Sequence, residues 1–195
     1  MSQAHAAALE HMGTGIPSNK LGMWLFLASE VMFFTGLIAA YIVLRMSHPA
    51  WPGPEGHLSK ALGGLNTFIL LCSSATMVLA FVEAQRGRQG ALRMQLGWTI
   101  VLGMAFLGIK AYEYSTKLSH GIAPSTNVFW SCYYTLTGFH ALHVLGGIIA
   151  NGWLFIRTLQ GRIHLASAYK LELAGLYWHF VDIVWLFLFP LVYLL

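Results

Sequence analysis

Five long apolar stretches are the feature that most limits the folds open to this chain. They cover residues 21–44, 62–81, 92–114, 128–156 and 171–194. A helix needs about 20 apolar residues to cross the hydrocarbon core of a bilayer, and a spanning segment must satisfy its own backbone hydrogen bonds. Strands of a membrane barrel would be shorter and would alternate in polarity. The pattern therefore predicts an all-α, polytopic membrane protein, a bundle of five transmembrane helices.

The chain as a whole has too few charged residues for a soluble protein. Only 9% of its 195 residues are charged, against about 25% in soluble domains. The connections between the apolar stretches are short, so we expect a single membrane domain over residues 1–195. Residues 1–20 lack the basic start and continuous apolar core of a signal peptide and are expected to form a polar N-terminal arm. Two groups of small residues predict close helix packing: Gly36 with Ala40, and Gly146 and Gly147 with Ala150 and Asn151.

The net charge of +4 is interpreted as a topology signal, because Lys and Arg fall between the apolar stretches. A cytoplasmic N-terminus would place seven basic residues inside and three outside. The inside set is Lys20, Arg86, Arg88, Arg93, Arg157, Arg162 and Lys170, and the outside set is Arg45, Lys60 and Lys117. Cytoplasmic loops carry the excess of basic residues, so we expect the N-terminus inside and the C-terminus outside. No nucleic-acid partner is expected.

Seven of the ionisable side chains within the apolar stretches are candidate site residues, because a charge there costs roughly 2.5–3.5 kcal/mol. They are Glu30, Lys110, Glu113, His140, His143, His179 and Asp182. Six of them form pairs three residues apart, which lie on the same side of a helix. We therefore expect Lys110 to pair with Glu113, His179 to pair with Asp182, and His140 and His143 to form a polar strip. Glu30 has no such neighbour, so its partner should be that strip or a hydroxyl such as Ser73, Ser74 or Thr76.

These residues admit three interpretations. A di-metal carboxylate site needs Glu-x-x-His pairs on facing helices, which the stretches lack, and a haem would have only three deep histidines to choose from. A proton relay is typically built from intramembrane Asp, Glu and His. The third interpretation is a polar network that fixes helix packing, in which Asp182→Ala alone should destabilise the chain by leaving buried partners unsatisfied. Cys72 and Cys132 lie in apolar stretches and form no metal-binding motif.

Five motifs resemble the helices of one known family, subunit III of the haem–copper oxidases, also called the cytochrome c oxidase subunit III family. They are ASEVMFF (Ala28–Phe34), LNTFILLCSSATM (Leu65–Met77), AYEY (Ala111–Tyr114), TGFHALHVLGG (Thr137–Gly147) and YWHFVDIVWLFLF (Tyr177–Phe189). They occur in the family's order over most of the chain. By position, Glu30 matches the family's buried carboxylate, and the histidine and aspartate pairs match its GFHxxHV and WHFVD motifs.

The resemblance implies a non-catalytic subunit of a proton-pumping oxidase that reduces O₂ to water in aerobic respiration. Such a subunit has no catalytic residue, redox centre or metal of its own; haem and copper belong to its partners. The implied partners are the catalytic subunit I, subunit II, small subunits, membrane lipids including bound phospholipid, and a respiratory supercomplex. The implied role is to stabilise subunit I, support proton uptake and maintain lipid and O₂ access. The implied location is the bacterial inner membrane.

The chain departs from the family pattern in two ways. The mitochondrial form has seven helices, so a lipid cleft built by the two missing helices must be absent or completed by another subunit. Lys110 stands where the family often has Gln, which a Lys110–Glu113 pair would explain. A quinol oxidase or nitric oxide reductase subunit, a haem b-binding quinone anchor and a stand-alone transporter remain the alternatives.

Overall fold

The computed structural model describes residues 18–54, 58–161 and 168–195, and these residues form helices and connecting turns without a strand. The helices are α2 (Ser18–Ser47), α3 (Lys60–Gln85), α4 (Gln89–Ser119), α5 (Val128–Leu159) and α6 (Ala168–Phe189), and α6 continues into the π-helical turn η2 (Pro190–Leu194). Five helical segments are long and apolar enough to cross a membrane. The predicted all-α fold with five spanning helices is confirmed.

The helices are longer than the apolar stretches that predicted them. The third continues to Ser119 rather than ending at residue 114, because the backbone hydrogen bonds of a helix extend past the hydrocarbon into the polar interface. For the same reason α2 already begins at Ser18, so residues 18–20 of the predicted polar arm are helical. The remainder of that arm lies outside the described residues.

The helix ends follow local sequence signals. The side chains of Ser59 and Asn127 accept hydrogen bonds from backbone N–H groups in the first turns of α3 and α5, as N-cap residues do. Gly87 and Gly121 follow α3 and α4 with φ of 71° and 76°. This left-handed conformation suits glycine and lets the backbone that follows return hydrogen bonds to the last helical carbonyls.

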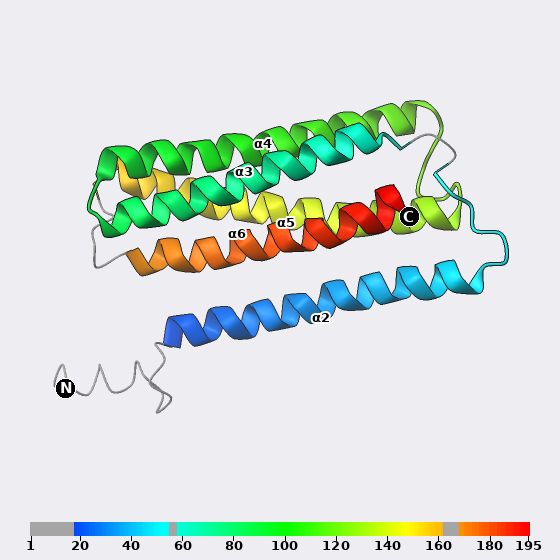
Figure 1. The fold of residues 1–195 in the computed structure, drawn as a ribbon, viewed down its shortest axis with the longest axis horizontal. Helices are drawn as coiled ribbons and strands as arrows, with labels where there is room; N and C mark the ends of the chain where they lie inside the picture. Colours follow the sequence, from blue (N-terminus) through cyan, green and yellow to red (C-terminus); the bar gives the residue numbers. More distant parts are fainter. Residues whose placement is uncertain (1–17, 55–57, 162–167) are drawn as a thin grey trace.

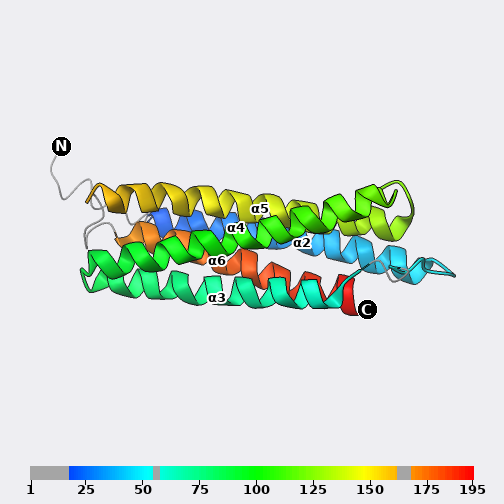
Figure 2. The same cartoon turned by 90° about the horizontal axis from the view of Figure 1, so that it is seen from above.

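Helices α3 to α6 form a four-helix bundle, and α2 lies along its outside against α6 and α5 (Figure 1). Helices α4 and α6 each pack against both α3 and α5, so α3 and α5 face each other across the bundle (Figure 2). The core of the bundle is therefore formed by α3 to α6, and α2 contacts it from the outside through α6 and α5.

Trp178 of α6 fills the centre of the bundle. Its indole N–H donates to Ser73 Oγ at 3.0 Å, and a Cβ atom on Gly103 or Gly147 would lie 2.8 or 2.6 Å from its ring. Only glycine leaves room for the indole at these two positions. The predicted close packing at Gly147 is found, whereas a Cβ atom on Gly36 would meet no atom of the described residues within 4 Å.

Pro190 marks the change from α6 to η2. Proline has no backbone N–H and cannot continue the α-helical hydrogen-bond ladder. The chain instead widens into a π-helical turn closed by Leu195 N–H donating to the Pro190 carbonyl at 3.1 Å. Tyr193 of this turn is buried, so η2 brings a phenol into the core of the bundle.

Candidate functional site

A buried charge cluster joins α4 to α5 and η2. Lys110 Nζ lies 3.0 Å from Glu113 Oε2 and Lys117 Nζ lies 2.7 Å from Glu113 Oε1. All three side chains are at most 4% exposed. The predicted pairing of Lys110 with Glu113 is found. Lys117, which the charge count assigns to the outside, is the second cation of the cluster, because α4 extends beyond it and places it one turn from Glu113.

Two tyrosines complete this cluster. Lys110 Nζ donates to Tyr193 Oη at 2.6 Å and to Tyr133 Oη at 3.2 Å, and Tyr193 donates to Glu113 at 2.9 Å. The Lys110 ammonium also lies 5.1 Å from the centre of the Trp185 ring, a favourable cation–π distance. Buried charges that are paired and fully hydrogen-bonded are tolerated but are costly to separate. The cluster therefore fixes η2 and α5 to α4.

Glu30 of α2 meets His143 of α5 near the middle of the membrane span. Glu30 Oε2 lies 2.9 Å from His143 Nε2, and both side chains are a little under one-fifth exposed. The rings of Phe33 and Phe34 contact the imidazole, and the ring of Phe139 packs against Phe33. The partner predicted for Glu30 from the histidines of α5 is thus found, and this pair links α2 to the bundle.

The hydrogen bonds of His143 indicate where the protons of the Glu30–His143 pair lie. Its Nδ1 atom lies 2.7 Å from the Phe139 carbonyl oxygen, which can only accept. Nδ1 therefore carries a hydrogen, and a further proton must lie between Nε2 and Glu30. The pair is either imidazolium with carboxylate or neutral imidazole with carboxylic acid. Both forms are neutral overall, which suits the interior of a membrane.

His179 and Asp182 are not paired with each other, contrary to the prediction. His179 Nδ1 instead hydrogen-bonds the Ser74 hydroxyl of α3. Asp182 is 4% exposed, and neither carboxyl oxygen has a hydrogen-bond partner within the described part of the chain. The Ser74 hydroxyl also interacts with Asp182, although without hydrogen-bond geometry. The pairing with His179 that was to make Asp182→Ala destabilising is therefore not found, and Ser74 is the group that the structure places near the carboxyl instead.

His140 and His143 do not form the predicted polar strip. Three residues advance a helix by about 300°, so side chains three apart diverge by about 60°. His143 reaches α2, whereas His140 is fully buried against Trp185, with ring centres 5.1 Å apart, and Phe106, at 5.6 Å. Neither nitrogen of His140 has a hydrogen-bond partner among the residues that the structure describes.

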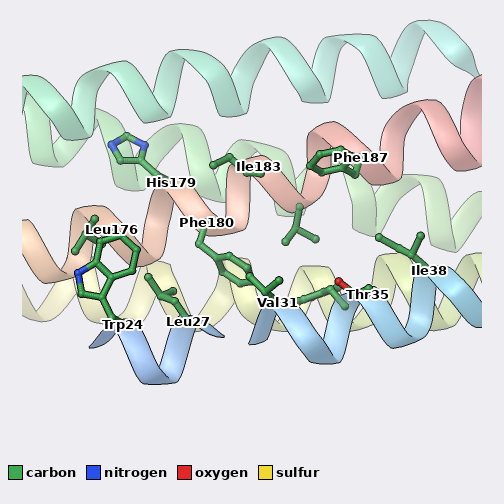
Figure 3. A pocket seen from close by; sticks show the side chains of 12 residues that line it. Trp24, Leu27, Val31, Thr35, Ile38, Leu176, His179, Phe180, Ile183 and Phe187 are labelled. Atoms are coloured by element: carbon green, nitrogen blue, oxygen red, sulfur yellow. The ribbon is translucent and has the colours of Figure 1, made fainter. Parts of the chain in front are cut away.

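A groove of about 380 Å³ runs between α2 and α6. Figure 3 shows its wall of side chains from Trp24 to Ile38 on one helix and from Leu176 to Phe187 on the other. The lining is apolar apart from Thr35 and His179. His179 therefore contacts both the groove and, through Ser74, the interior of the bundle.

The arrangement is suited to holding helices together and to moving a proton over a short distance. Within the described ranges no group of three or more His, Cys, Asp and Glu is placed to hold a metal ion. Sequence reasoning missed Lys117, Tyr133 and Tyr193 as members of the Glu113 cluster, and it named Ser74 as a candidate partner of Glu30 rather than of His179. The four-residue spacing of Glu113 and Lys117 is a signal that could have found Lys117; the two tyrosines and Ser74 come from other helices and give no such signal.

Comparison with known proteins identifies the family. The family profile described as "Cytochrome c oxidase subunit III" matches residues 4–195. A cytochrome c oxidase subunit 3 from Bacillus sp. (strain PS3) is 35% identical over 195 residues, covering 100% of this chain and 94% of the relative. The proteins of that name from Thermostichus vulcanus and Synechocystis sp. are 38% and 42% identical, covering 100% and 95% of this chain and 96% and 79% of theirs. The chain belongs to the cytochrome c oxidase subunit III family.

Proposed function

We propose that this chain is the non-catalytic subunit III of a haem–copper terminal oxidase that reduces O₂ to water and pumps protons. The observation that carries the proposal is the match to subunit 3 proteins over the whole described bundle. The chain would contribute no redox centre, while haem and copper would be held by its partners. A quinol oxidase or nitric oxide reductase subunit and a haem b-binding quinone anchor are not favoured by these relatives.

The partners in this proposal are subunit I, subunit II and small subunits, within a respiratory supercomplex in the bacterial inner membrane. The whole of residues 1–195 would act as one membrane domain with a cytoplasmic N-terminus. Since α2 packs loosely on the outside of the bundle, its opposite face is available to such partners or to lipid.

The Glu30–His143 pair supports a role in proton uptake. It forms a hydrogen bond of 2.9 Å between two helices, and it is partly exposed. Glu30→Gln keeps a hydrogen bond to His143 but cannot release a proton, whereas Glu30→Leu removes both. We expect Glu30→Gln to slow proton uptake in the assembled oxidase without changing assembly. If only Glu30→Leu has an effect, the pair serves helix packing alone.

The groove between α2 and α6 supports a role in lipid binding. Its length follows the helix axes and its walls are almost entirely apolar, which fits the acyl chain of a phospholipid. In this proposal a lipid held there would lie on a route by which apolar O₂ reaches the oxidase from the membrane.

The test of the proposed function is purification of the tagged chain in mild detergent, followed by a reduced-minus-oxidised haem spectrum before and after its partners are stripped away. We expect oxidase haems to co-purify and to leave with the partners. Haem b that stays on the stripped chain would contradict the proposal and make His140, His143 and His179 candidate ligands.

A further inference from the structure

Asn66 and His140 are two of the buried polar residues whose side chains lack hydrogen-bond partners among the described residues. Asn66 of α3 and His140 of α5 are both 0% exposed. Both amide atoms of Asn66 and both ring nitrogens of His140 are without a partner among the described residues. Burying such a group without a hydrogen bond is costly, and most buried side-chain polar atoms in proteins have a partner. Four atoms in this state therefore need an explanation.

Trp185 of α6 connects the surroundings of the two residues, because it contacts His140 and the chain neighbour of Asn66. The Trp185 indole N–H donates to Thr67 Oγ1 at 2.9 Å, so the residue next to Asn66 is at the height of this ring. His140 stacks on the same ring. Asn66 belongs to the buried stripe of α3 and His140 to that of α5, and these two helices face each other across the bundle (Figure 2).

We propose that Asn66 and His140 form a binding site for ordered water in the core of the bundle. Water matches their chemistry, because it can accept from the Asn66 amide and donate to the unprotonated nitrogen of a neutral imidazole. A buried water typically makes about three hydrogen bonds to polar groups that would otherwise be unsatisfied. Neither side chain alone offers that number of partners, so the site needs both helices.

The neighbourhood adds an electrostatic reason for water at this place. The ammonium of Lys110 lies over the same Trp185 ring at 5.1 Å, and Lys110 and Lys117 share the single carboxylate of Glu113. The cluster thus has two basic groups for one acid. The dipole of a water molecule between Asn66 and His140 can turn its oxygen toward the nearby cation, which stabilises the excess positive charge in a region of low dielectric.

The experiment is water-to-protein magnetisation transfer by solid-state NMR, on the full oxidase complex in bilayers with ¹⁵N-labelled Asn, His and Trp in this chain. We expect transfer from a slowly exchanging water to the side chains of Asn66 and His140. The indole N–H of Trp178 is the internal control, because it is 0% exposed and already donates to Ser73, and it should receive none. Absence of transfer to both Asn66 and His140, or a direct coupling between the two side chains, would overturn the proposal.

A double-variant cycle tests whether the two residues share the same water. Asn66→Leu and His140→Phe should each lower the unfolding midpoint and abolish the transfer to the remaining partner, and the double variant should lose less than the sum of the two. Strictly additive losses with the transfer retained in each single variant would contradict a shared site. The measurement on the unsubstituted complex remains decisive if either variant fails to assemble.

Discussion

Asp182 and Glu113 are both buried carboxyl residues, but only Glu113 is surrounded by cations. Glu113 contacts two ammonium groups and a phenol, whereas Asp182 has no hydrogen bond to the described residues. Removing one member of a satisfied buried cluster leaves the others unpaired, while replacing an unpaired group of the same shape is close to neutral. Loss of the charge should therefore lower the free energy of unfolding much more at Glu113 than at Asp182.

Glu113→Gln should destabilise the chain strongly. It leaves Lys110 and Lys117 buried without a counter-charge, and breaking a buried pair in this way costs about 3–5 kcal/mol. The free energy of unfolding in detergent measures the loss. Lys110→Met is the matched control, because Glu113 keeps Lys117 and Tyr193 as partners, and its loss should be clearly smaller. Equal losses in the two variants would show that the charge balance does not matter.

Asp182→Asn should change the free energy of unfolding by no more than about 1 kcal/mol, because no hydrogen bond is lost and the volume is kept. Ser74 retains His179 as its partner. The free energy of unfolding in detergent, measured as for Glu113→Gln, checks this expectation. A loss of several kcal/mol would mean that the Asp182 carboxylate has a partner after all, and the pairing with His179 predicted from the sequence would regain support.

At the scale of helices, the close approach of α4 and α5 to α6 depends on glycine. Gly147→Ala places a methyl group 2.6 Å from the Trp178 ring, in a core where the indole cannot move, and overpacking of this kind costs about 1–3 kcal/mol. Gly36→Ala is the control, because nothing lies within 4 Å of its added Cβ and alanine favours a helix by about 1 kcal/mol. The midpoint of thermal unfolding should therefore fall in Gly147→Ala and rise in Gly36→Ala. A stabilised Gly147→Ala variant would contradict the packing seen around Trp178.

The number of helices could be predicted from the sequence, because each apolar stretch is long enough to span the bilayer by itself. Contacts within one helix were predicted with mixed success. Lys110 and Glu113 have flexible side chains that close a gap of 60°, whereas the rigid imidazoles of His140 and His143 diverge into different surroundings. Contacts between helices, such as that of Tyr193 with Glu113, depend on helix rotation and on the turn at Pro190, which no local pattern specifies.

At the scale of the whole molecule, the distribution of basic residues predicts the orientation in the membrane. The expectation sets seven basic residues inside against Arg45, Lys60 and Lys117 outside. Lys117 is ion-paired within the bundle, and three residues of the inside set are ion-paired as well. Ion pairing therefore leaves the inside set the larger one, and a cytoplasmic N-terminus stays the prediction.

This orientation can be tested with single cysteines in a background carrying Cys72→Ala and Cys132→Ala. Arg88→Cys lies at the turn between α3 and α4, and His120→Cys lies at the turn after α4, at the opposite end of that helix. A membrane-impermeant maleimide added to intact spheroplasts should label His120→Cys, whereas Arg88→Cys should react only after the membrane is permeabilised. Equal labelling of both after solubilisation controls for reactivity. Labelling of Arg88→Cys alone in intact spheroplasts would reverse the orientation, and the Lys117 cluster would then lie toward the cytoplasmic side, where protons enter.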